Sequence, residues 1–300
     1  MSNLLILGGR AGEHLAIRIA KTLNAELGEI EVKHFPDNEI YIRIKSDVES
    51  KDIIYINSLQ RGPNDLIVET IYTLETIKEL GARRIIAVIP YMAYARQDDR
   101  FNPGEAISIK ILAKMFKSIG LDKLYTIDMH LHRITNPKEI FGEGFENLTA
   151  IGEIAKYIKQ NHSIENSIVI GPDEESKQWA QIMAKELGGL EYDILVKRRI
   201  TAEKVVIEPK EVDVSGRNVI IIDDIISTGG TIEEAVKVLR KLNARKLIVA
   251  CVHPILVGRA LPRLLRLNLT DLIGTDTILS PISKVSVAPV IVKAILKFLK

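Results

Sequence analysis

The sequence predicts an α/β fold with a mostly parallel sheet, repeated in two domains. Short apolar runs rich in β-branched residues alternate with longer stretches of helical periodicity along the chain. The runs are apolar on both faces, as in strands that helices cover on two sides. Three segments of the first half also recur in order in the second half. Alternation and repetition together favour a duplicated α/β domain.

Eight apolar runs are expected to be strands, four in each half of the chain. They are residues 3–7, 52–56, 84–89, 123–127, 167–171, 192–196, 218–222 and 246–252. Helical periodicity lies between them. The expected helices include residues 64–80, 104–119, 174–187 and 231–242.

The repeat aligns "DIIYINSLQRGPND" (52–65) with "NVIIIDDIISTGGT" (218–231), an offset of 166. "LGARRIIAVIP" resembles "LNARKLIVACV" at an offset of 162, and "LLILGG" echoes "SIVIGP" at 163. Three matches in one order favour duplication over shared α/β patterning. The first copy has Asn57 and Ser58 where the second has Asp223 and Asp224. This asymmetry indicates one catalytic site per chain.

The segment 140–150, which contains two glycines, is the candidate boundary between the copies. We therefore expect a first domain at 1–144, a second at 145–281, and a C-terminal helix within 282–300.

Composition excludes several classes of protein. Acidic and basic residues nearly balance, with a formal net charge of +2, so neither an acidic tail nor a basic nucleic-acid-binding tail is expected. No apolar segment approaches the ~20 residues of a membrane-spanning helix, and the N-terminus resembles a strand and turn, not a signal peptide. Cys251, the single cysteine, lies in an apolar run and is expected to be a buried thiol in a reducing cytoplasm.

The segment "DDIISTGGT" (223–231) joins a predicted strand to a predicted helix. Amides at a helix N-terminus bind anions, and glycines let a phosphate approach the backbone. The two aspartates would repel a phosphate but suit sugar hydroxyls or a metal ion. A capped helix after a solvated turn is the alternative. The pattern favours ribose 5-phosphate, bound by Asp223, Asp224, Ser227, Thr228, Gly229, Gly230 and Thr231.

Five further segments combine charged, aromatic and histidine side chains, and each alone has a simpler explanation. "FPDNE" can be a proline turn, "YARQDDR" a solvated loop and "VKRRI" a basic surface run. The segments are "FPDNE" (35–39), "PYMAYARQDDR" (90–100), "DMHLH" (128–132), "GPDEES" (171–176) and "VKRRI" (196–200). Zinc is not expected, because no cysteine cluster or HExxH motif accompanies the histidines.

Together these segments resemble ribose-phosphate pyrophosphokinases, in order and over essentially the whole chain. Residues 223–231 resemble the phosphoribosyl-binding motif of type I phosphoribosyltransferases. The resemblance implies two tandem phosphoribosyltransferase-like domains, each a mostly parallel sheet flanked by helices, with the C-terminal helix packed on the first. The implied reaction moves the β,γ-pyrophosphoryl group of Mg-ATP to the 1-hydroxyl of ribose 5-phosphate. Its products are AMP and phosphoribosyl pyrophosphate, for nucleotide biosynthesis.

The resemblance also assigns roles to single residues. ATP is expected to contact Phe35, Asp37, Glu39, Arg96 and Gln97, with the 35–39 loop often supplied by a neighbouring subunit. The catalytic residues would be Lys197, Arg199 and His130. Mg²⁺ would be held by His130, with Asp128 nearby, and by Asp173, whereas His132 is expected to be structural.

One departure from the family lies beside Asp173. The family commonly has a glycine pair where Glu175 and Ser176 stand. The resemblance therefore does not define the local shape of this loop. Trp179, which follows this loop, is expected to be on a helix and to pack against the rest of the domain.

Two other functions remain open. A nucleobase phosphoribosyltransferase would need neither "FPDNE" nor a duplicated half. A non-catalytic regulatory subunit usually loses its catalytic loop, whereas Lys197, Arg199, Asp223 and Asp224 are all present.

The expected partners are ATP, ribose 5-phosphate and further copies of the chain. The resemblance implies a homo-oligomer, at least a dimer, with shared ATP sites and a cytoplasmic location. No nucleic acid or membrane partner is expected. The amphipathic C-terminal segment, residues 286–300, could alternatively lie on a membrane surface.

Overall fold

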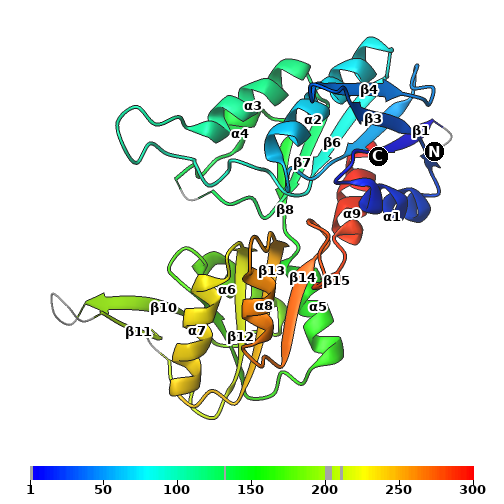
Figure 1. Cartoon of the computed structure of the whole chain (residues 1–300). Helices are drawn as coiled ribbons and strands as arrows, with labels where there is room; N and C mark the ends of the chain where they lie inside the picture. Colours follow the sequence, from blue (N-terminus) through cyan, green and yellow to red (C-terminus); the bar gives the residue numbers. More distant parts are fainter. Residues whose placement is uncertain (1–2, 132, 200–204, 210–211) are drawn as a thin grey trace. The chain divides into compact units, whose positions relative to one another are not determined.

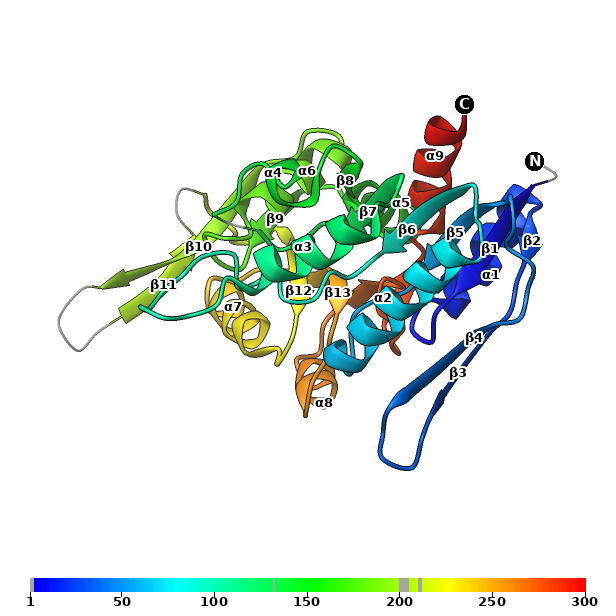
Figure 2. The same cartoon turned by 90° about the horizontal axis from the view of Figure 1, so that it is seen from above.

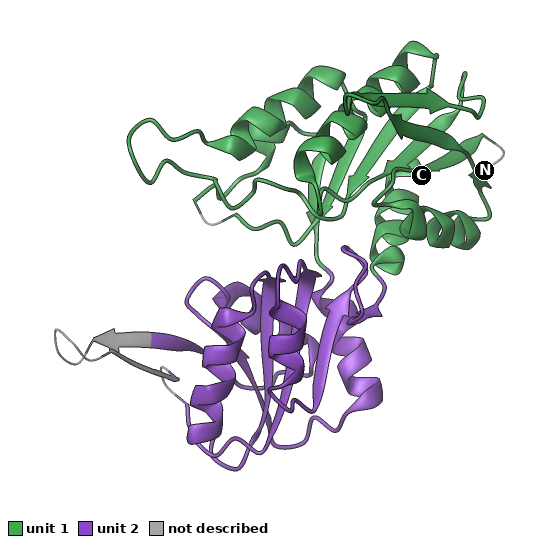
Figure 3. Ribbon diagram, in the orientation of Figure 1, with its two compact units in different colours: residues 1–149, 287–300 green, residues 150–286 purple. Residues whose placement is uncertain are grey.

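The computed structural model describes residues 3–131, 133–199, 205–209 and 212–300, with only the backbone at 197–199 and 205–208. The chain divides into two compact units, coloured separately in Figure 3. Unit 1 is Met1–Thr149 with Val287–Lys300, and unit 2 is Ala150–Ser286. The sequence analysis had placed the domain boundaries after residues 144 and 281.

Unit 1 contains a six-stranded sheet in which every neighbouring pair is parallel. Along the sheet the order is β2-β1-β5-β6-β7-β8. The central strand β5 is buried at all five positions, which explains its apolar character on both faces. The strands are β1 (Leu4–Gly8), β2 (Glu26–Leu27), β5 (Asp52–Ile56), β6 (Arg84–Ile89), β7 (Lys123–Ile127) and β8 (Phe145–Leu148).

Helices cover both faces of this sheet (Figure 1). Helix α1 (Glu13–Leu23) contacts the C-terminal helix α9 (Ala288–Leu299), and α2 (Pro63–Glu79) contacts α3 (Ser108–Ile119). Parallel crossovers are right-handed, so the direction of a crossover along the sheet decides which face its helix covers. The crossover from β1 to β2 through α1 runs in one direction, and the crossovers through α2 and α3 run in the other, so these helices lie on opposite faces. The short helix α4 (Lys138–Phe141) precedes β8.

The C-terminal helix α9 is part of unit 1 although it follows unit 2 in sequence. Its residues Ile291 and Ile295 are fully buried. The Tyr125 hydroxyl of β7 donates a hydrogen bond of 3.0 Å to the Ala294 carbonyl. Among the described residues, none of the helices has the length and apolar character needed to cross a bilayer.

A separate hairpin of β3 (Ile30–His34) and β4 (Ile40–Ile44) projects from unit 1, as Figure 2 shows. The Phe35 N–H donates to the Glu39 carbonyl at 2.8 Å, and the Asn38 N–H donates to the Phe35 carbonyl at 2.9 Å. Asn38 has a φ of 68°, a conformation that asparagine tolerates. The sequence analysis recognised a proline turn here but not the two strands that carry it.

Unit 2 contains a seven-stranded sheet with the order β11-β10-β9-β12-β13-β14-β15. Only the edge pair β10–β11 is antiparallel. The strands are β9 (Ser167–Gly171), β10 (Tyr192–Arg199), β11 (Val205–Pro209), β12 (Asn218–Ile226), β13 (Lys246–Pro254), β14 (Asp271–Thr275) and β15 (Ser283–Val285). Cys251 is fully buried in β13, as predicted.

The helices of unit 2 also form two pairs. Helix α5 (Ile151–Asn161) contacts α6 (Lys177–Glu186), and α7 (Gly230–Lys241) contacts α8 (Ala260–Leu265). One layer of the core lies between the sheet and α7, and it includes Leu239. Trp179 of α6 is buried, which confirms its packing role.

The two units repeat one topology. Strands β2-β1-β5-β6-β7-β8 of unit 1 correspond in order to β10-β9-β12-β13-β14-β15 of unit 2. The predicted fold, two mostly parallel α/β domains with helices on both faces, is confirmed.

Two expected helix starts were wrong. Helix α3 begins at Ser108, not 104, because the Glu105 carboxylate accepts the N–H groups of Phe101 and Asn102 and holds a non-helical turn. Helix α6 begins at Lys177, not 174, because residues 173–176 form a hydrogen-bonded turn. Strand β12 continues through Ile226, beyond the expected end at 222, because it still pairs with β13.

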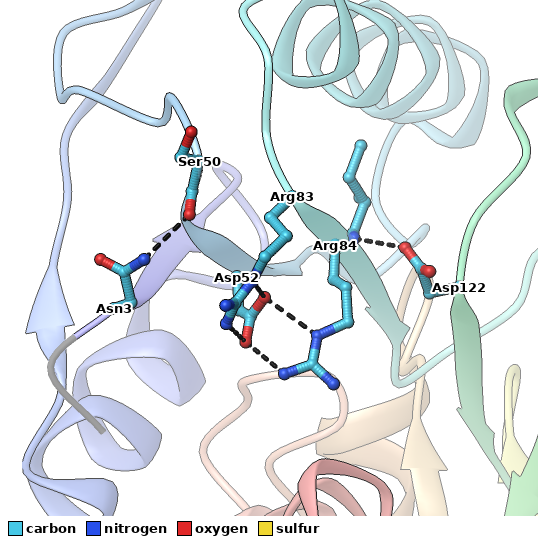
Figure 4. Close-up of polar contacts among 7 residues, drawn as sticks. Asn3, Ser50, Asp52, Arg83, Arg84 and Asp122 are labelled. Atoms are coloured by element: carbon cyan, nitrogen blue, oxygen red, sulfur yellow. Dashed lines mark hydrogen bonds and ion pairs between the residues drawn. The ribbon is translucent and has the colours of Figure 1, made fainter.

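Asp52 at the start of β5 joins two adjacent strands of unit 1 (Figure 4). Its carboxylate accepts hydrogen bonds from Arg84 Nε at 2.9 Å and from Arg83 Nε and Nη2 at 2.8 and 2.7 Å. The Arg84 guanidinium, with that of Arg83, holds the pKa of the buried Asp52 carboxyl well below its usual range. The folded state therefore favours the ionised form.

Asp52→Asn should lower the free energy of unfolding at pH 7 by about 1–3 kcal/mol, because two charge-assisted pairs lose their carboxylate. The folded-state pKa lies below the unfolded one, so this stabilisation is present above about pH 5 and is lost as the pH falls through the folded pKa. Urea unfolding at several pH values measures both effects.

The matched control is Glu26→Gln, which removes an exposed ion pair with Lys51 from the same unit. Its effect should stay within about 0.5 kcal/mol. An Asp52→Asn protein as stable as the original at pH 7 would contradict the assignment, as would a difference that persists at low pH.

Candidate active site

The paired carboxylates of unit 2 lie near the carboxyl end of the central strand β12. Asp223 and Asp224 are within this strand, and Asp223 is in register with Cys251 of β13. Asp224 is buried and Asp223 is partly exposed. The Asp224 N–H donates to Asp223 Oδ1 at 3.0 Å. The pair is therefore fixed by the sheet and not by a mobile turn.

Asp173 lies at the same edge of the sheet. It follows β9, which pairs in parallel with β12 up to Ile170 and Ile221. Burial and the neighbouring carboxylates of Asp224 and Asp173 raise the pKa of Asp223 well above its usual range. The three carboxyl groups thus influence one another at the end of two adjacent strands, and the ionised form of Asp223 is disfavoured there.

The loop 227–231 leads from the paired carboxylates into helix α7. Gly229 caps the helix with a φ of 76°, a conformation that strains other residues. Two hydrogen bonds from the segment after β13 hold the loop: the Val257 N–H donates to the Ser227 carbonyl at 3.1 Å, and Arg263 Nη1 donates to the Thr228 carbonyl at 3.1 Å. Thr228 and Thr231 are exposed at the start of the helix. The amides of the first turn are thereby arranged to receive an anion.

A pocket of ≈ 350 Å³ adjoins these residues. It is bounded by the turn after β9, by Leu195 of β10 and by the first turns of α7. Its lining residues are Pro172, Asp173, Glu174, Glu175, Leu195, Thr231, Glu234 and Ala235.

Unit 1 gathers a second set of predicted residues at the carboxyl edge of its own sheet. Arg96 and Gln97 are in the loop after β6, and His130 follows the adjacent strand β7. Arg96 is exposed, whereas Gln97 and His130 are partly buried. Gln97 Nε2 donates to Glu105 Oε2 at 3.2 Å.

Asp98 links the two loops of unit 1. Its carboxylate is buried and accepts the N–H of Arg133 at 2.6 Å and that of Ile134 at 3.3 Å. The sequence pattern indicates only a charged cluster that contains Asp98 and does not predict this link. The one sequence signal for it is that Asp98 directly follows Arg96 and Gln97.

The hairpin carries Phe35, Asp37 and Glu39 apart from the other ATP candidates of unit 1. In both Figures 1 and 2 it lies away from the loop that follows β6. Phe35 is 50% exposed, and its ring meets Tyr41 edge-on with centroids 5.9 Å apart. Asp37 Oδ1 accepts the Glu39 N–H at 3.2 Å. The tip therefore offers an exposed aromatic ring beside two carboxylates.

Three further predicted positions are described in part or not at all. Lys197 and Arg199 belong to β10, whose backbone pairs with β11 at Ile207 and Val205. Their side chains lie outside the described part of the structure, as does His132.

In unit 1 the position that corresponds to the carboxylate pair is occupied by hydrogen-bonded side chains of the protein. Asn57, aligned with Asp223, is fully buried and donates to Glu69 Oε1 at 3.3 Å. The Glu69 carboxylate, also fully buried, accepts the Arg10 N–H at 2.9 Å and Arg10 Nε at 2.6 Å. A buried side-chain carboxylate of the protein thus lies beside Asn57, the position aligned with Asp223.

The carboxylates of unit 2 fit a hard cation. Mg²⁺ takes oxygen ligands and is usually held by one or two carboxylates together with substrate phosphates. A divalent cation would relieve the repulsion between Asp173, Asp223 and Asp224. Across the described residues, histidine, cysteine and acidic side chains form no group of three that could hold an ion by itself. The residues therefore suit an ion that also takes ligands from bound phosphate.

Comparison with known proteins covers both units. The sequence profile described as the N-terminal domain of ribose phosphate pyrophosphokinase matches residues 4–120, and that of the phosphoribosyl transferase domain matches residues 143–274. Over 292 residues the chain is 39% identical to the ribose-phosphate pyrophosphokinase of Methanopyrus kandleri, covering 97% of this chain and 98% of the relative.

Two further relatives agree. Ribose-phosphate pyrophosphokinase 1 of Archaeoglobus fulgidus is 37% identical over 97% of this chain and 100% of its own length. The crystal structure of phosphoribosylpyrophosphate synthetase from Mycobacterium smegmatis is 28% identical and superposes with a TM-score of 0.87 over 99% of both chains.

Asp223→Asn should make the substrate-free and metal-free protein more stable at neutral pH, with a rise in Tm of a few degrees. The folded pKa of Asp223 is raised, so the stability available below the unfolded pKa, about 4, is lost as the pH rises through the folded pKa. The amide avoids that loss. Differential scanning calorimetry in EDTA at pH 7 and pH 4 measures the gain, which should vanish at pH 4.

Glu153→Gln is the control, because it removes a carboxylate of unit 2 that pairs with Lys156 on helix α5. It should bring no gain in Tm. An Asp223→Asn protein that is less stable than the original at pH 7 would show that the carboxylates do not repel one another.

Proposed function

Because the chain belongs to the ribose-phosphate pyrophosphokinase family, we propose that the residues gathered at its two sheet edges bind ATP and ribose 5-phosphate and carry out pyrophosphoryl transfer between them. The reaction itself is that of the family: the 1-hydroxyl of ribose 5-phosphate attacks the β-phosphorus of ATP. The bond from that phosphorus to the AMP oxygen breaks, and the sugar keeps the pyrophosphate.

The observation that carries the assignment is the arrangement of Asp223 and Asp224 directly before the loop 227–231. The amides and hydroxyls of Ser227, Thr228, Gly229, Gly230 and Thr231 receive the 5-phosphate. The carboxylates accept hydrogen bonds from the ribose hydroxyls. A ligand with a phosphate at one end and a diol at the other satisfies both groups.

ATP is bound by unit 1 in this proposal. Arg96 is exposed and can contact the triphosphate through its guanidinium group, with Gln97 and His130 beside it. Phe35 offers a face on which adenine can stack, and Asp37 and Glu39 can accept from its amino group. Since the hairpin lies away from Arg96 within its own unit, these residues serve the ATP site of a neighbouring copy.

Catalysis rests on positioning and on neutralising charge. Lys197, Arg199 and His130 stabilise the negative charge that develops on the transferring pyrophosphoryl group. Asp173 and His130 would hold Mg²⁺, which supplies further charge neutralisation on the phosphates when bound. The proposal includes a homo-oligomer, at least a dimer, in the cytoplasm, where both substrates are made.

The alternatives lose support from specific observations. A nucleobase phosphoribosyltransferase does not account for the match of residues 4–120 to a pyrophosphokinase N-terminal domain. A non-catalytic subunit does not account for the retained carboxylates and phosphate loop of unit 2.

The direct test is ³¹P NMR of the purified protein with Mg-ATP and ribose 5-phosphate. AMP and a sugar pyrophosphate should appear together, and only when ribose 5-phosphate is present. Formation of ADP would refute attack at the β-phosphorus. Binding of ribose 5-phosphate without turnover would favour the non-catalytic alternative.

Lys197→Ala should lower kcat by on the order of 10²–10³, because a cation is lost from the transferring group. Folding should be unaffected, as judged by Tm and circular dichroism. Lys241→Ala removes an exposed cation from the last turn of α7 in the same unit and should leave kcat unchanged. Near-normal turnover of Lys197→Ala would remove it from the catalytic set.

Mixing two inactive proteins should restore activity if the ATP site is shared between copies. One protein carries Phe35→Ala with Asp37→Ala, and the other carries Lys197→Ala. A hybrid dimer contains one intact site, so a random mixture should recover up to about a quarter of the original activity. Mixing after brief dissociation, with each protein alone as control, gives the measurement. No recovery despite proven hybrid formation would place the hairpin in its own chain's site.

A further inference from the structure

Ser176 and Asp173 bind each other reciprocally. Ser176 Oγ accepts the Asp173 N–H at 3.2 Å and donates to the Asp173 carbonyl at 2.6 Å. In return, Asp173 Oδ1 accepts the Ser176 N–H at 3.1 Å. The two residues satisfy each other's amides as in a capping box, but here they close a turn that ends before the helix and do not cap its first turn. Helix α6 begins at the next residue, Lys177.

These hydrogen bonds leave one carboxylate oxygen of Asp173, Oδ2, able to bind a ligand. Oδ1 is held by the Ser176 amide, while across the described residues no hydrogen bond engages Oδ2. Asp173 lines the pocket that Thr231 also lines, so it lies at the ligand edge of the sheet. Ser176 itself is fully buried and cannot contact substrate directly.

The structure also shows what stands in place of the family's glycine pair. Ser176 has φ −79° and ψ −3°, which any residue adopts, so this turn does not require glycine at 176. Its hydroxyl occupies space beside Gly171, where an added Cβ would come within 2.3 Å of Ser176 Oγ. Gly171 and Ser176 therefore fit together only because residue 171 has no side chain.

We propose that Ser176 is a positioning residue that holds the Asp173 carboxylate at the cation and ribose edge of unit 2. The inference rests on the proposed role of Asp173. Glycine at 176 would keep the N–H that Asp173 Oδ1 accepts but would lack a hydroxyl, whereas in this chain Ser176 Oγ adds two bonds to the backbone of Asp173 and closes the turn. A fixed ligand loses less conformational freedom when a cation binds, and removing such a supporting group typically weakens metal binding about 10–100-fold.

The test compares Mn²⁺ binding, followed by the electron paramagnetic resonance signal of the free ion, in the presence of saturating ribose 5-phosphate. Ser176→Ala should raise the Mn²⁺ Kd about tenfold. In steady-state assays the Mg²⁺ concentration for half-maximal rate should rise by a similar factor, while kcat at saturating Mg²⁺ changes by less than about twofold. Asp173→Asn should raise the Mn²⁺ Kd further.

Ser283→Ala is the matched control. The Ser283 hydroxyl also makes several hydrogen bonds within unit 2, donating to the Thr275 carbonyl at 2.9 Å and to the Ile278 carbonyl at 3.2 Å. Its loss should lower Tm and leave the Mn²⁺ Kd unchanged. A purely structural role for Ser176 would give the same pattern as this control.

The outcomes separate the two levels of the proposal. An unchanged Mn²⁺ Kd in Ser176→Ala, with a raised Kd in Asp173→Asn, overturns the positioning role and leaves the proposed function intact. An unchanged Kd in Asp173→Asn removes Asp173 from the metal site and the inference with it. If Ser176→Ala does not fold, Ser176→Gly, the residue common in the family, provides the same comparison.

Discussion

The parallel pairing of β9 with β12 is the constraint on which the candidate site depends. It brings the segment after Gly171 and the carboxylates of Asp223 and Asp224 to one edge, although they are far apart in sequence. The phosphate loop then needs only to continue from β12 into α7. A shift in this register would separate Asp173 from Asp223, Asp224 and the loop that follows them, so the apolar pairing of the two strands also holds the candidate site together.

The two copies of the fold show different uses of the same strand ends. In unit 2 the neighbouring carboxylates disfavour the ionised form of Asp223, and the proposed cation and sugar would offset this local cost in stability. In unit 1 the Glu69 carboxylate lies beside the corresponding Asn57 and is bound by Arg10 and Asn57. Here the protein supplies both the anion and its partners.

Much of the fold could be predicted from the sequence, because fully buried strands are continuous apolar runs. Strands β5, β6, β7 and β9 have the expected bounds. The helix starts at Ser108 and Lys177 could not be predicted, since they depend on side-chain bonds from Glu105 and Ser176. For the site, the motif 223–231 predicted a strand that leads through two aspartates and a loop into a helix, and the structure has this arrangement. The link from Asp98 to Arg133 could not be foreseen, because it joins two loops through tertiary contact.

The close approach of Gly171 to the Ser176 hydroxyl has a consequence for how this site can diverge among relatives. A side chain at 171 conflicts with the Ser176 hydroxyl where it now lies, because 2.3 Å is far inside van der Waals contact. Alanine at 171 would therefore require that hydroxyl to rotate away or to be lost, and it would still lie 3.1 Å from Ile194 Cγ2. Substitutions at the two positions are thus coupled by geometry as well as by selection on catalysis.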